Sequence, residues 1–442
     1  MEERLYPRRQ LGEKYLVAPS PMLESSRRQH KRVRLLLFAA KLGYQIRVFE
    51  DAARRLGIDV QLVTDRCHIL DDPWGDHAVP VHFDDAVGSL AAIEGPADGI
   101  VAVADRPLYL AALAAEKLGL RFHSPHSIQK SQNKHLARQA FSDAGLLTPH
   151  YERFSVGQTS RPVRRTYPCV LKPLALSGSR GVIRANNDDE FEQAWARISK
   201  LLDSGEIRER RDEADRFIQV ESYISGQEFA VEGLLRKGRL QVLAIFDKPE
   251  PLEGPFFEET IYVTPSCASP ATQIRIVEAM ERAVVAVGLS DGPLHGECRV
   301  NSEGVWVLEV AGRPIGGLCA RALTFNDGQP LEEVILRAAL SASSGRQAGD
   351  VKLDGGASGV MMIPVPGSGV LEGVDGVREA TSVTHVTEVL ITAKEGERLV
   401  PLPEGNSYPG FIFARAESQA MVEVALREAH GKLHFRLLKT LN

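Results

Sequence analysis

Short apolar runs alternate with amphipathic stretches in the N-terminal part of the chain. The strand candidates are residues 33–38, 58–63 and 99–104, and the helix candidates are residues 45–56 and 107–118. Pro107 suits the first position of its helix, where no N–H is needed. Strands that alternate with helices predict β-α-β units and a parallel sheet with helices on its faces. We therefore expect residues 31–124 to form one α/β domain.

After residue 124 the pattern changes to hairpins and longer strands, which is typical of α+β structure. The helix candidates here are residues 128–144, 188–202 (capped by Asn187) and 270–287, and the strand candidates are 168–173, 182–184, 217–221, 228–235 and a hairpin at 295–310. We expect a central domain over residues 125–345, which contains a small α+β module at about 155–222. Residues 346–442 are expected to form a separate C-terminal α+β domain, and residues 1–30 a basic extension.

Composition narrows the functional classes. The 442 residues are 43% hydrophobic and 25% charged, and 53 basic against 58 acidic side chains leave a net charge of −5, which gives no general reason to bind nucleic acid or an anionic membrane. The longest apolar runs are too short for a membrane helix, and the N-terminus lacks the apolar core of a signal peptide, so we expect a cytoplasmic protein. Five scattered cysteines predict buried, reduced thiols and no disulfide framework or zinc site.

Two glutamates in the hairpin at 295–310 are the strongest chemical signal. A three-residue turn over 302–304 would pair Asn301 with Val305 and place Glu297 opposite Glu309 on one face. The opposite face would hold the apolar residues Cys298, Val300, Trp306, Leu308 and Val310. Opposed carboxylates repel unless a cation lies between them, and oxygen ligands favour Mg²⁺ or Mn²⁺. A solvent-facing hairpin with incidental acids is the alternative.

A lysine that feeds a loop of small residues is the second signal. Lys172 ends a strand and is followed by a loop that contains Ser177, Gly178, Ser179, Arg180 and Gly181. Backbone N–H groups in such loops approach phosphate oxygens closely, while the lysine neutralises their charge. The loop is not a Walker A motif, and an ordinary hairpin turn would have the same composition.

Taken in order, four segments resemble the ATP-grasp ligase superfamily, and the resemblance covers roughly residues 33–341. The segments are Gln132-Asn-Lys134-His-Leu-Ala-Arg138, the Lys172 loop, Glu221-Ser-Tyr-Ile-Ser-Gly-Gln-Glu228, and the Glu297/Glu309 hairpin. The resemblance implies an ATP-grasp fold, in which an N-terminal parallel α/β domain precedes two α+β subdomains that enclose ATP, with a small C-terminal α+β domain.

The resemblance also implies roles for individual residues. Lys134 and Lys172 would bind phosphate, and the Ser177–Gly181 segment would be the mobile loop over the β- and γ-phosphates. Glu221, Ser222, Tyr223 and Ile224 would form the adenine-binding hinge, Glu228 would bind ribose, and Glu297 and Glu309 would hold magnesium.

Two further stretches resemble the L-amino-acid ligase branch of that superfamily. One contains Glu259 and Tyr262, and the other places Arg313 four residues after Glu309. In the branch, the matching acid faces the substrate amino group and the matching arginine faces the reacting carboxylate and phosphoryl group, as charge complementarity requires. Two positions depart from the pattern: Ala311 stands where many members carry asparagine, and Tyr262 where a branch member can carry histidine.

The expected activity is therefore an ADP-forming carboxylate-amine ligase that uses ATP and Mg²⁺ (or Mn²⁺) and proceeds through an acyl phosphate. Its expected partners are small carboxylate and amine substrates, namely amino acids, with no nucleic acid or membrane, and the resemblance also implies a homodimer. The alternatives are a bicarbonate-using enzyme of the carboxylase or carbamoyl-phosphate synthase type, and a non-catalytic ATP-binding sensor.

Overall fold

The computed structural model describes residues 33–40, 44–65, 78–157, 166–326, 328–344, 351–405 and 407–438. The predicted basic extension at residues 1–30 and Cys67 lie outside these ranges. Of the other cysteines, Cys169, Cys298 and Cys319 are buried as predicted, but Cys267 is exposed. No helix in the described ranges combines the length and the apolar character that crossing a membrane demands.

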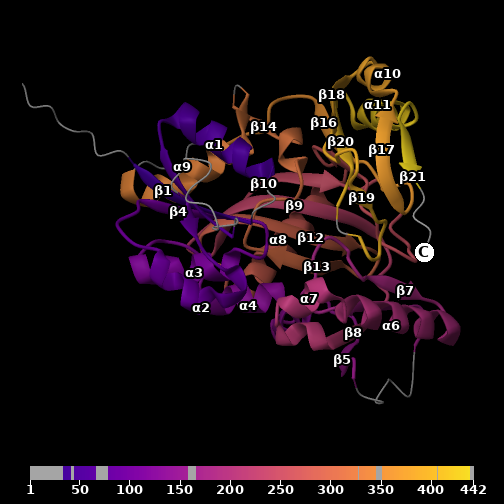
Figure 1. Ribbon diagram of the computed structural model, residues 1–442, viewed down its shortest axis with the longest axis horizontal. Coiled ribbons are helices and arrows are strands. Elements are labelled where there is room, and N and C mark those ends of the chain that lie inside the picture. The colour runs from indigo at the N-terminus through magenta and orange to yellow at the C-terminus, as the bar shows by residue number, and fades with distance from the viewer. Residues whose placement is uncertain are drawn as a thin grey trace, which may run out of the picture. The chain divides into compact units, whose positions relative to one another are not determined.

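The first sheet is parallel, as the β-α-β pattern predicted (Figure 1). Its strands lie in the order β3 (Val79–Pro80), β2 (Asp59–Thr64), β1 (Arg34–Ala39) and β4 (Gly99–Val103). The helices around it are α1 (Tyr44–Leu56), α2 (Ala86–Ser89), α3 (Leu108–Leu118) and α9 (Leu331–Ser344). Pro107 is the N-cap of α3 and not its first helical residue. Helix α9 comes from far along the chain and packs on α1 and β4, so this sheet is covered by distant sequence.

The helix predicted over residues 128–144 is two helices, α4 (Pro125–Gln132) and α5 (Lys134–Asp143). Asn133 separates them because its backbone is extended, with φ −104° and ψ 109°. Its side chain accepts hydrogen bonds from the N–H groups of His135 and Leu136, which makes it the N-cap of α5. Lys134 therefore starts a helix instead of lying inside one.

A small antiparallel sheet follows, with α6 (Asp188–Leu202) packed against it (Figure 1). Its strands lie in the order β5 (Tyr151–Ser155), β8 (Phe217–Ser222), β6 (Cys169–Pro173) and β7 (Ile183–Ala185), with α7 (Gly205–Glu209) between α6 and β8. Asn187 caps α6 as predicted by accepting a hydrogen bond from the N–H of Glu190. Phe191, Trp195 and Ile198 of α6 fill the core of this module.

The largest sheet has eight strands and extends across residue 345, where we expected a separate domain to begin. Its order is β13 (Val305–Ala311), β12 (Gly292–Val300), β9 (Gln227–Arg236), β10 (Arg239–Asp247), β11 (Ile261–Thr264), β16 (Ala357–Met362), β20 (Gly410–Ala416) and β18 (Val386–Ile391). The ladder between β11 and β16 joins the central and C-terminal parts of the chain through backbone hydrogen bonds.

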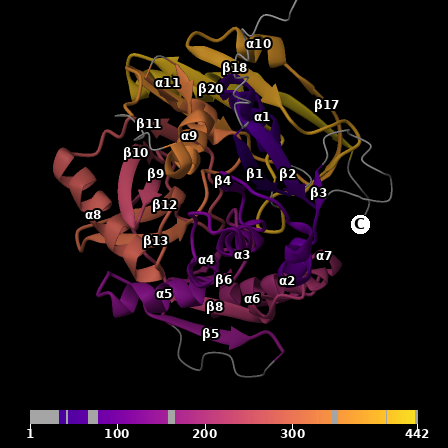
Figure 2. The same cartoon turned by 90° about the vertical axis from the view of Figure 1, so that its left-hand side faces the viewer.

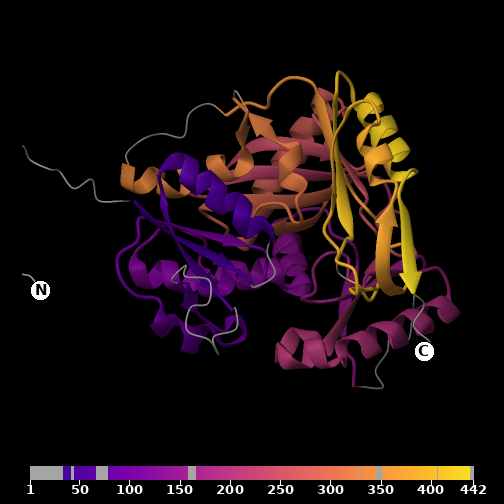
Figure 3. The same ribbon diagram turned by 45° about the horizontal axis from the view of Figure 1, so that its top comes forward.

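Two long helices cover parts of this sheet. Helix α8 (Pro270–Val287) packs on β13 and β10 (Figure 2), and α11 (Gln419–His430) packs on β20 and β16 (Figure 3). The other α-helix and strands of the described residues are α10 (Val377–Thr381), the pair β14 (Thr324–Phe325) and β15 (Gln329–Pro330), and a three-stranded sheet of β19 (Arg398–Leu399), β17 (Gly369–Asp375) and β21 (His434–Leu438).

Candidate active site

A cavity of about 570 Å³ is lined by residues from all three of the larger sheets and from the C-terminal part of the chain. Most of the sequence-predicted site residues line it, namely Lys134, Lys172, Ser177, Gly178, Ser179, Glu221, Ser222, Tyr223, Ile224, Glu228, Glu259, Glu297, Glu309 and Arg313. Arg180 and Gly181 do not. Segments that lie far apart in sequence therefore meet around one hollow.

The loop after β6 has the geometry of an anion-binding turn. Gly178 and Ser179 both have positive φ, 64° and 54°. Within the described residues, their backbone N–H groups donate to no protein oxygen, and both residues face the cavity. Lys134 reaches the same loop, because its Nζ donates to the carbonyl oxygen of Leu176 at 2.5 Å. Free N–H groups beside two lysines fit the phosphate chain of a nucleotide.

Arg180 and Gly181 hold the loop in place from outside the cavity. The N–H of Gly181 donates to the carbonyl oxygen of Pro403 at 2.8 Å, and Arg180 Nε donates to the carbonyl oxygen of Glu404 at 2.8 Å. The Glu404 carboxylate in turn accepts two hydrogen bonds from Arg197 of α6. The C-terminal part of the chain, which contains none of the sequence-predicted site residues, thus contacts the predicted phosphate loop.

Glu221 is a buried carboxylate that positions Lys172. Its Oε1 accepts from Arg138 Nε at 2.8 Å and from Gln219 at 2.6 Å, and its Oε2 is paired with Lys172 Nζ. Burial opposes the charged carboxylate, but Arg138 and Lys172 outweigh it and lower the pKa of Glu221 to about 2. The side chain of Glu221 is therefore committed to the lysine, which leaves its backbone for the hinge role suggested by the resemblance.

Arg299 connects the predicted hinge to the predicted ribose ligand. Its guanidinium donates to Glu228 Oε2 at 2.7 Å and to the carbonyl oxygen of Ile224 at 2.7 Å. The same guanidinium lies over the ring of Tyr223, 5.5 Å from its centroid. Arg299 is almost fully buried, so it fixes the side of the cavity on which Tyr223, Ile224 and Glu228 lie.

Glu297 and Glu309 face each other as predicted, although the turn that we expected is wrong. Strand β12 pairs Val300 with Val305, so residues 301–304 form a four-residue turn. The Asn301 side chain stabilises this turn by accepting hydrogen bonds from the N–H groups of Glu303 and Gly304. A bulge then places one extra residue between the pairs Cys298–Val307 and Glu297–Glu309, which restores the predicted register at the two acids.

The bulge also changes which side chains face the core. Cys298 and Val310 are buried there as predicted. Trp306 and Leu308 are not part of this buried core, and Val305 and Val307 are buried in their place. Side chains along a strand point alternately to its two faces, so an extra residue in β13 changes the face to which the side chains on one side of it point. As a result Leu308 lines the cavity.

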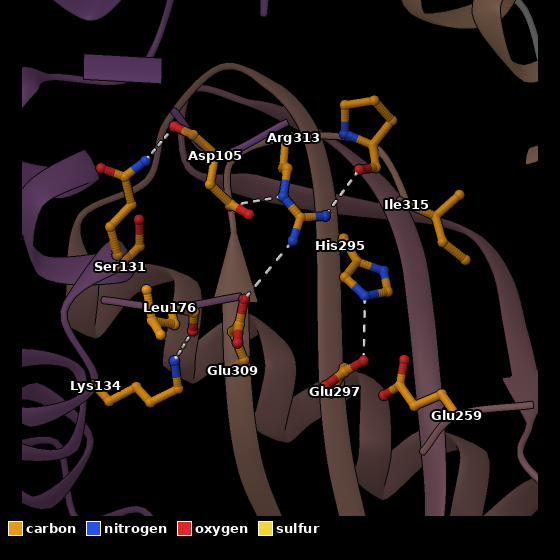
Figure 4. A network of polar contacts seen from close by, with 12 residues as sticks. Asp105, Ser131, Lys134, Leu176, Glu259, His295, Glu297, Glu309, Arg313 and Ile315 are labelled. Carbon is orange, nitrogen blue, oxygen red and sulfur yellow. Dashed lines mark hydrogen bonds and ion pairs between the residues drawn. The ribbon is translucent and has the colours of Figure 1, made fainter. Parts of the chain in front are cut away.

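Glu297 and Glu309 are held differently (Figure 4). Lys248 at 2.9 Å, His295 at 3.4 Å and Tyr262 at 3.4 Å all contact the same Glu297 oxygen, Oε1. Within the described residues, Oε2 of Glu297 accepts no hydrogen bond. Glu309 lies 3.9 Å from Arg313, and its side chain is 31% exposed. Two opposed carboxylates with free oxygen lone pairs are a donor set that fits Mg²⁺ or Mn²⁺.

Arg313 lies between two acids at the end of β13 (Figure 4). Its Nε donates to Asp105 Oδ1 at 2.7 Å, and an NH group donates to the carbonyl oxygen of Pro314 at 3.1 Å. Burial opposes the charge, but Asp105 outweighs it and raises the pKa of Arg313 above its usual value. The guanidinium is therefore a fixed, permanent positive charge beside Glu309 at the cavity wall.

Glu259 and two tyrosines form another part of the wall. Tyr262 donates its hydroxyl to Glu259 Oε2 at 2.8 Å. Burial and repulsion from Glu297 raise the pKa of Glu259 to about 7. Tyr408 and Met362, from the C-terminal part of the chain, line the same cavity. This region thus combines one carboxylate with apolar and aromatic surface.

Sequence reasoning assigned no role to Lys248, His295 or Asp105. His295 contacts both Glu232 and Glu297. Although burial opposes its charge, these acids raise the pKa of His295 to about 10. One signal was available: His295, Glu297 and Arg299 occupy alternate positions of one strand, so their side chains share a face. Nothing local to Lys248 or Asp105 indicates that their side chains reach the cavity.

Comparisons with known families agree with this geometry. Residues 165–322 match the ATP-grasp domain family, residues 49–121 match the ATP-grasp N-terminal domain family, and residues 361–437 match L-amino acid ligase C-terminal domain 2. The crystal structure of an L-amino acid ligase from Bacillus licheniformis is similar, with a TM-score of 0.74 and 27% identity over 92% of this chain and 99% of that one.

Two curated relatives match over shorter stretches. The ATP-grasp enzyme fsqD of Aspergillus fumigatus is 26% identical over 61% of this chain and 53% of its own length. The alanine–anticapsin ligase of Bacillus subtilis is 27% identical over 43% of this chain and 42% of its own length. The chain thus spans about half the length of these relatives or less.

The fold, the cavity and the three matched families define an ATP-grasp protein, which is similar to members of the ATP-grasp ligase superfamily. Within that superfamily, the C-terminal family match and the Bacillus licheniformis structure show a similarity to the L-amino-acid ligase branch.

Proposed function

We propose that this chain is an ATP-dependent carboxylate-amine ligase that joins an amino acid, or a similar carboxylate, to an amine and releases ADP and phosphate. One observation carries the proposal. The cavity brings a phosphate-type loop with two lysines, an opposed glutamate pair and a buried arginine around one volume. The similarity to an L-amino acid ligase over 92% of the chain supports the same class.

The reaction would have two steps. A carboxylate oxygen of the first substrate attacks the γ-phosphorus of ATP, the bond to the β-phosphate oxygen breaks, and ADP leaves. The amine nitrogen of the second substrate then attacks the carbonyl carbon of the acyl phosphate, phosphate leaves, and the nitrogen loses a proton. No covalent bond to the enzyme is needed, so the protein acts by positioning and by stabilising charge.

The described residues suit these tasks. Lys134, Lys172 and the N–H groups of Gly178 and Ser179 would bind phosphate oxygens. Glu297 and Glu309 would hold Mg²⁺, which neutralises charge on the phosphates when bound. Arg313 would orient the reacting carboxylate and stabilise charge on the transferred phosphoryl group.

Phosphate release from Mg-ATP, measured with L-amino acids singly and in pairs, tests the proposal. We expect release that depends on a pair of substrates, together with a product whose mass equals the two acids less one water. The same reactions without the second amino acid are the control. Release that needs bicarbonate, or ATP binding with no release under any condition, would contradict the ligase.

The pH dependence should reflect Lys172. Burial lowers the pKa of Lys172 to about 8, and Arg138 and Lys134 act in the same direction against the attraction of Glu221. Lys172 is therefore charged below pH 8 and loses its attraction for phosphate above it. We expect kcat/KM for ATP to fall above about pH 8, with a limiting slope of about one log unit per pH unit.

A Lys172→Arg variant tests whether the titration of Lys172, and not that of another group, causes the fall in kcat/KM. A guanidinium stays charged throughout this range, so the fall should move to higher pH. The dependence of kcat/KM for ATP on pH is measured for both the natural chain and the Lys172→Arg variant. A falling limb at the same pH in the variant would show that another group titrates.

A further inference from the structure

Lys248 lies at the centre of three carboxylates. It directly follows β10, and its side chain is only 2% exposed. Its Nζ donates to Glu259 Oε1 at 2.6 Å, to Glu228 Oε1 at 2.8 Å and to Glu297 Oε1 at 2.9 Å. An ammonium group has three N–H donors, so all of them are used by these acids.

The same three acids have the spacing of a metal site. One oxygen from each of Glu228, Glu259 and Glu297 lies within 4.8 Å of the others. Lys248 already contacts all three, at distances of 2.6–2.9 Å that are typical of charge-assisted hydrogen bonds. The positive charge that this cluster requires is therefore supplied by the chain itself, and the Glu297 oxygen that Lys248 contacts, Oε1, is the one that Tyr262 and His295 also contact.

The three acids belong to different parts of the cavity wall. Glu228 is fixed by Arg299, which also holds the backbone at Ile224. Glu259 is otherwise contacted by Tyr262, a neutral donor. Glu297 is otherwise contacted by His295 and, weakly, by Tyr262. Loss of Lys248 would thus leave Glu259 as the acid with no remaining cationic partner among the contacts described.

We propose that Lys248 is a positioning residue that serves as the resident cation of the Glu228–Glu259–Glu297 cluster and so joins the nucleotide, metal and amino-acid subsites. The proposal rests on the proposed function, and on the roles that the resemblance implies for Glu228 in binding ribose and for Glu259 in facing the substrate amino group. It assigns to Lys248 no contact with a reacting atom. Glu259 has no other cationic partner among the contacts described, so the removal of Lys248 should act chiefly on the subsite for the substrate amino group.

Steady-state kinetics of Lys248→Met test this unequal dependence. The change keeps the length of the side chain and removes its charge. We expect KM for the amino acid to rise at least about 30-fold, which corresponds to about 2 kcal/mol. KM for ATP should change less than about threefold, since Arg299 still holds Glu228. Lys248→Arg should recover part of the loss. Equal rises in both KM values, unchanged KM values or a fall in kcat alone would overturn the proposal.

Unfolding in urea tests the charge cluster without any catalytic activity. Lys248→Met should lower the unfolding midpoint, whereas Lys200→Met, at an exposed position of α6, should not. Adding Glu259→Gln to Lys248→Met should raise the midpoint again, although Glu259→Gln alone in the natural chain lowers it. Additive effects of the two substitutions would overturn the proposal.

The kinetic and the unfolding experiments together distinguish failure of the proposed function from failure of the Lys248 proposal. If no amino acids support turnover, the proposed function fails, but the unfolding cycle still decides whether Lys248 is the counter-ion of the cluster. If Lys248→Met does not fold, Lys248→Arg and the double variant provide the same comparison. Additive unfolding effects in an active ligase would overturn the Lys248 proposal alone.

Discussion

Replacing Glu297 with glutamine is expected to lower kcat by roughly 10³-fold, because charge stabilisation by a bound metal ion is worth several kcal/mol. Glutamine keeps the shape of the side chain, and its amide oxygen can still accept from Lys248. What it loses is the negative charge opposite Glu309. Phosphate release from Mg-ATP with the active amino-acid pair measures kcat, and the thermal unfolding midpoint shows whether the fold is intact.

Glu309→Gln should have a similar effect, since the pair acts on one cation. Glu303→Gln is the matched control, because Glu303 lies exposed in the turn of the same hairpin. It should retain full activity. If either Glu297→Gln or Glu309→Gln turned over at the natural rate, the metal-binding role of this pair would be refuted.

The second large effect concerns stability. Glu221→Gln should reduce the free energy of unfolding by about 3–5 kcal/mol, because it leaves Arg138 and Lys172 buried without their counter-ion. Urea unfolding at neutral pH measures the change. Glu206→Gln is a useful comparison, since Glu206 also pairs with an arginine, Arg180, but its side chain is 63% exposed. Its loss should cost only about 0–1 kcal/mol.

The direction in which pH changes the stability follows from the pairing of Glu221 with Arg138 and Lys172. The pKa of Glu221 is lowered from 4.5 to about 2 in the folded protein. Its stabilising contribution is therefore complete above about pH 4.5 and is lost as the pH falls toward 2. Glu221→Gln should lack this part of the acid dependence. Equal losses in the Glu221 and Glu206 variants would contradict the assignment of Glu221 as a buried counter-ion.

Local sequence patterns predicted most of the elements well. Helices α6 and α8 begin and end at the predicted residues, and Asn187 caps the first as predicted, while the structure shows that Ser269 caps the second. The parallel first sheet followed from alternating strands and helices. These features depend on residues that are near one another in the chain, so a sequence segment about as long as one helix or strand is enough to predict them.

Register was harder to predict than element type. The opposition of Glu297 and Glu309 was correct, but it depends on a four-residue turn and a compensating bulge. The turn depends on the Asn301 side chain, and Gly304 is needed because a Cβ there would lie 2.5 Å from the Leu147 side chain. That contact comes from a segment more than 150 positions earlier, which a local pattern cannot include.

The sequence alone predicted the resemblance to ATP-grasp ligases, a phosphate-binding role for the loop after Lys172, and the acidic hairpin, because each motif consists of residues close together in the chain. The three-dimensional structure was needed to show that Lys248 bridges three acids, that Glu221 is a buried counter-ion, and that the C-terminal strands continue the central sheet and help to line the cavity. Burial and ion pairing depend on which distant segments pack together, whereas periodicity along one strand shows a face but not what lies opposite it.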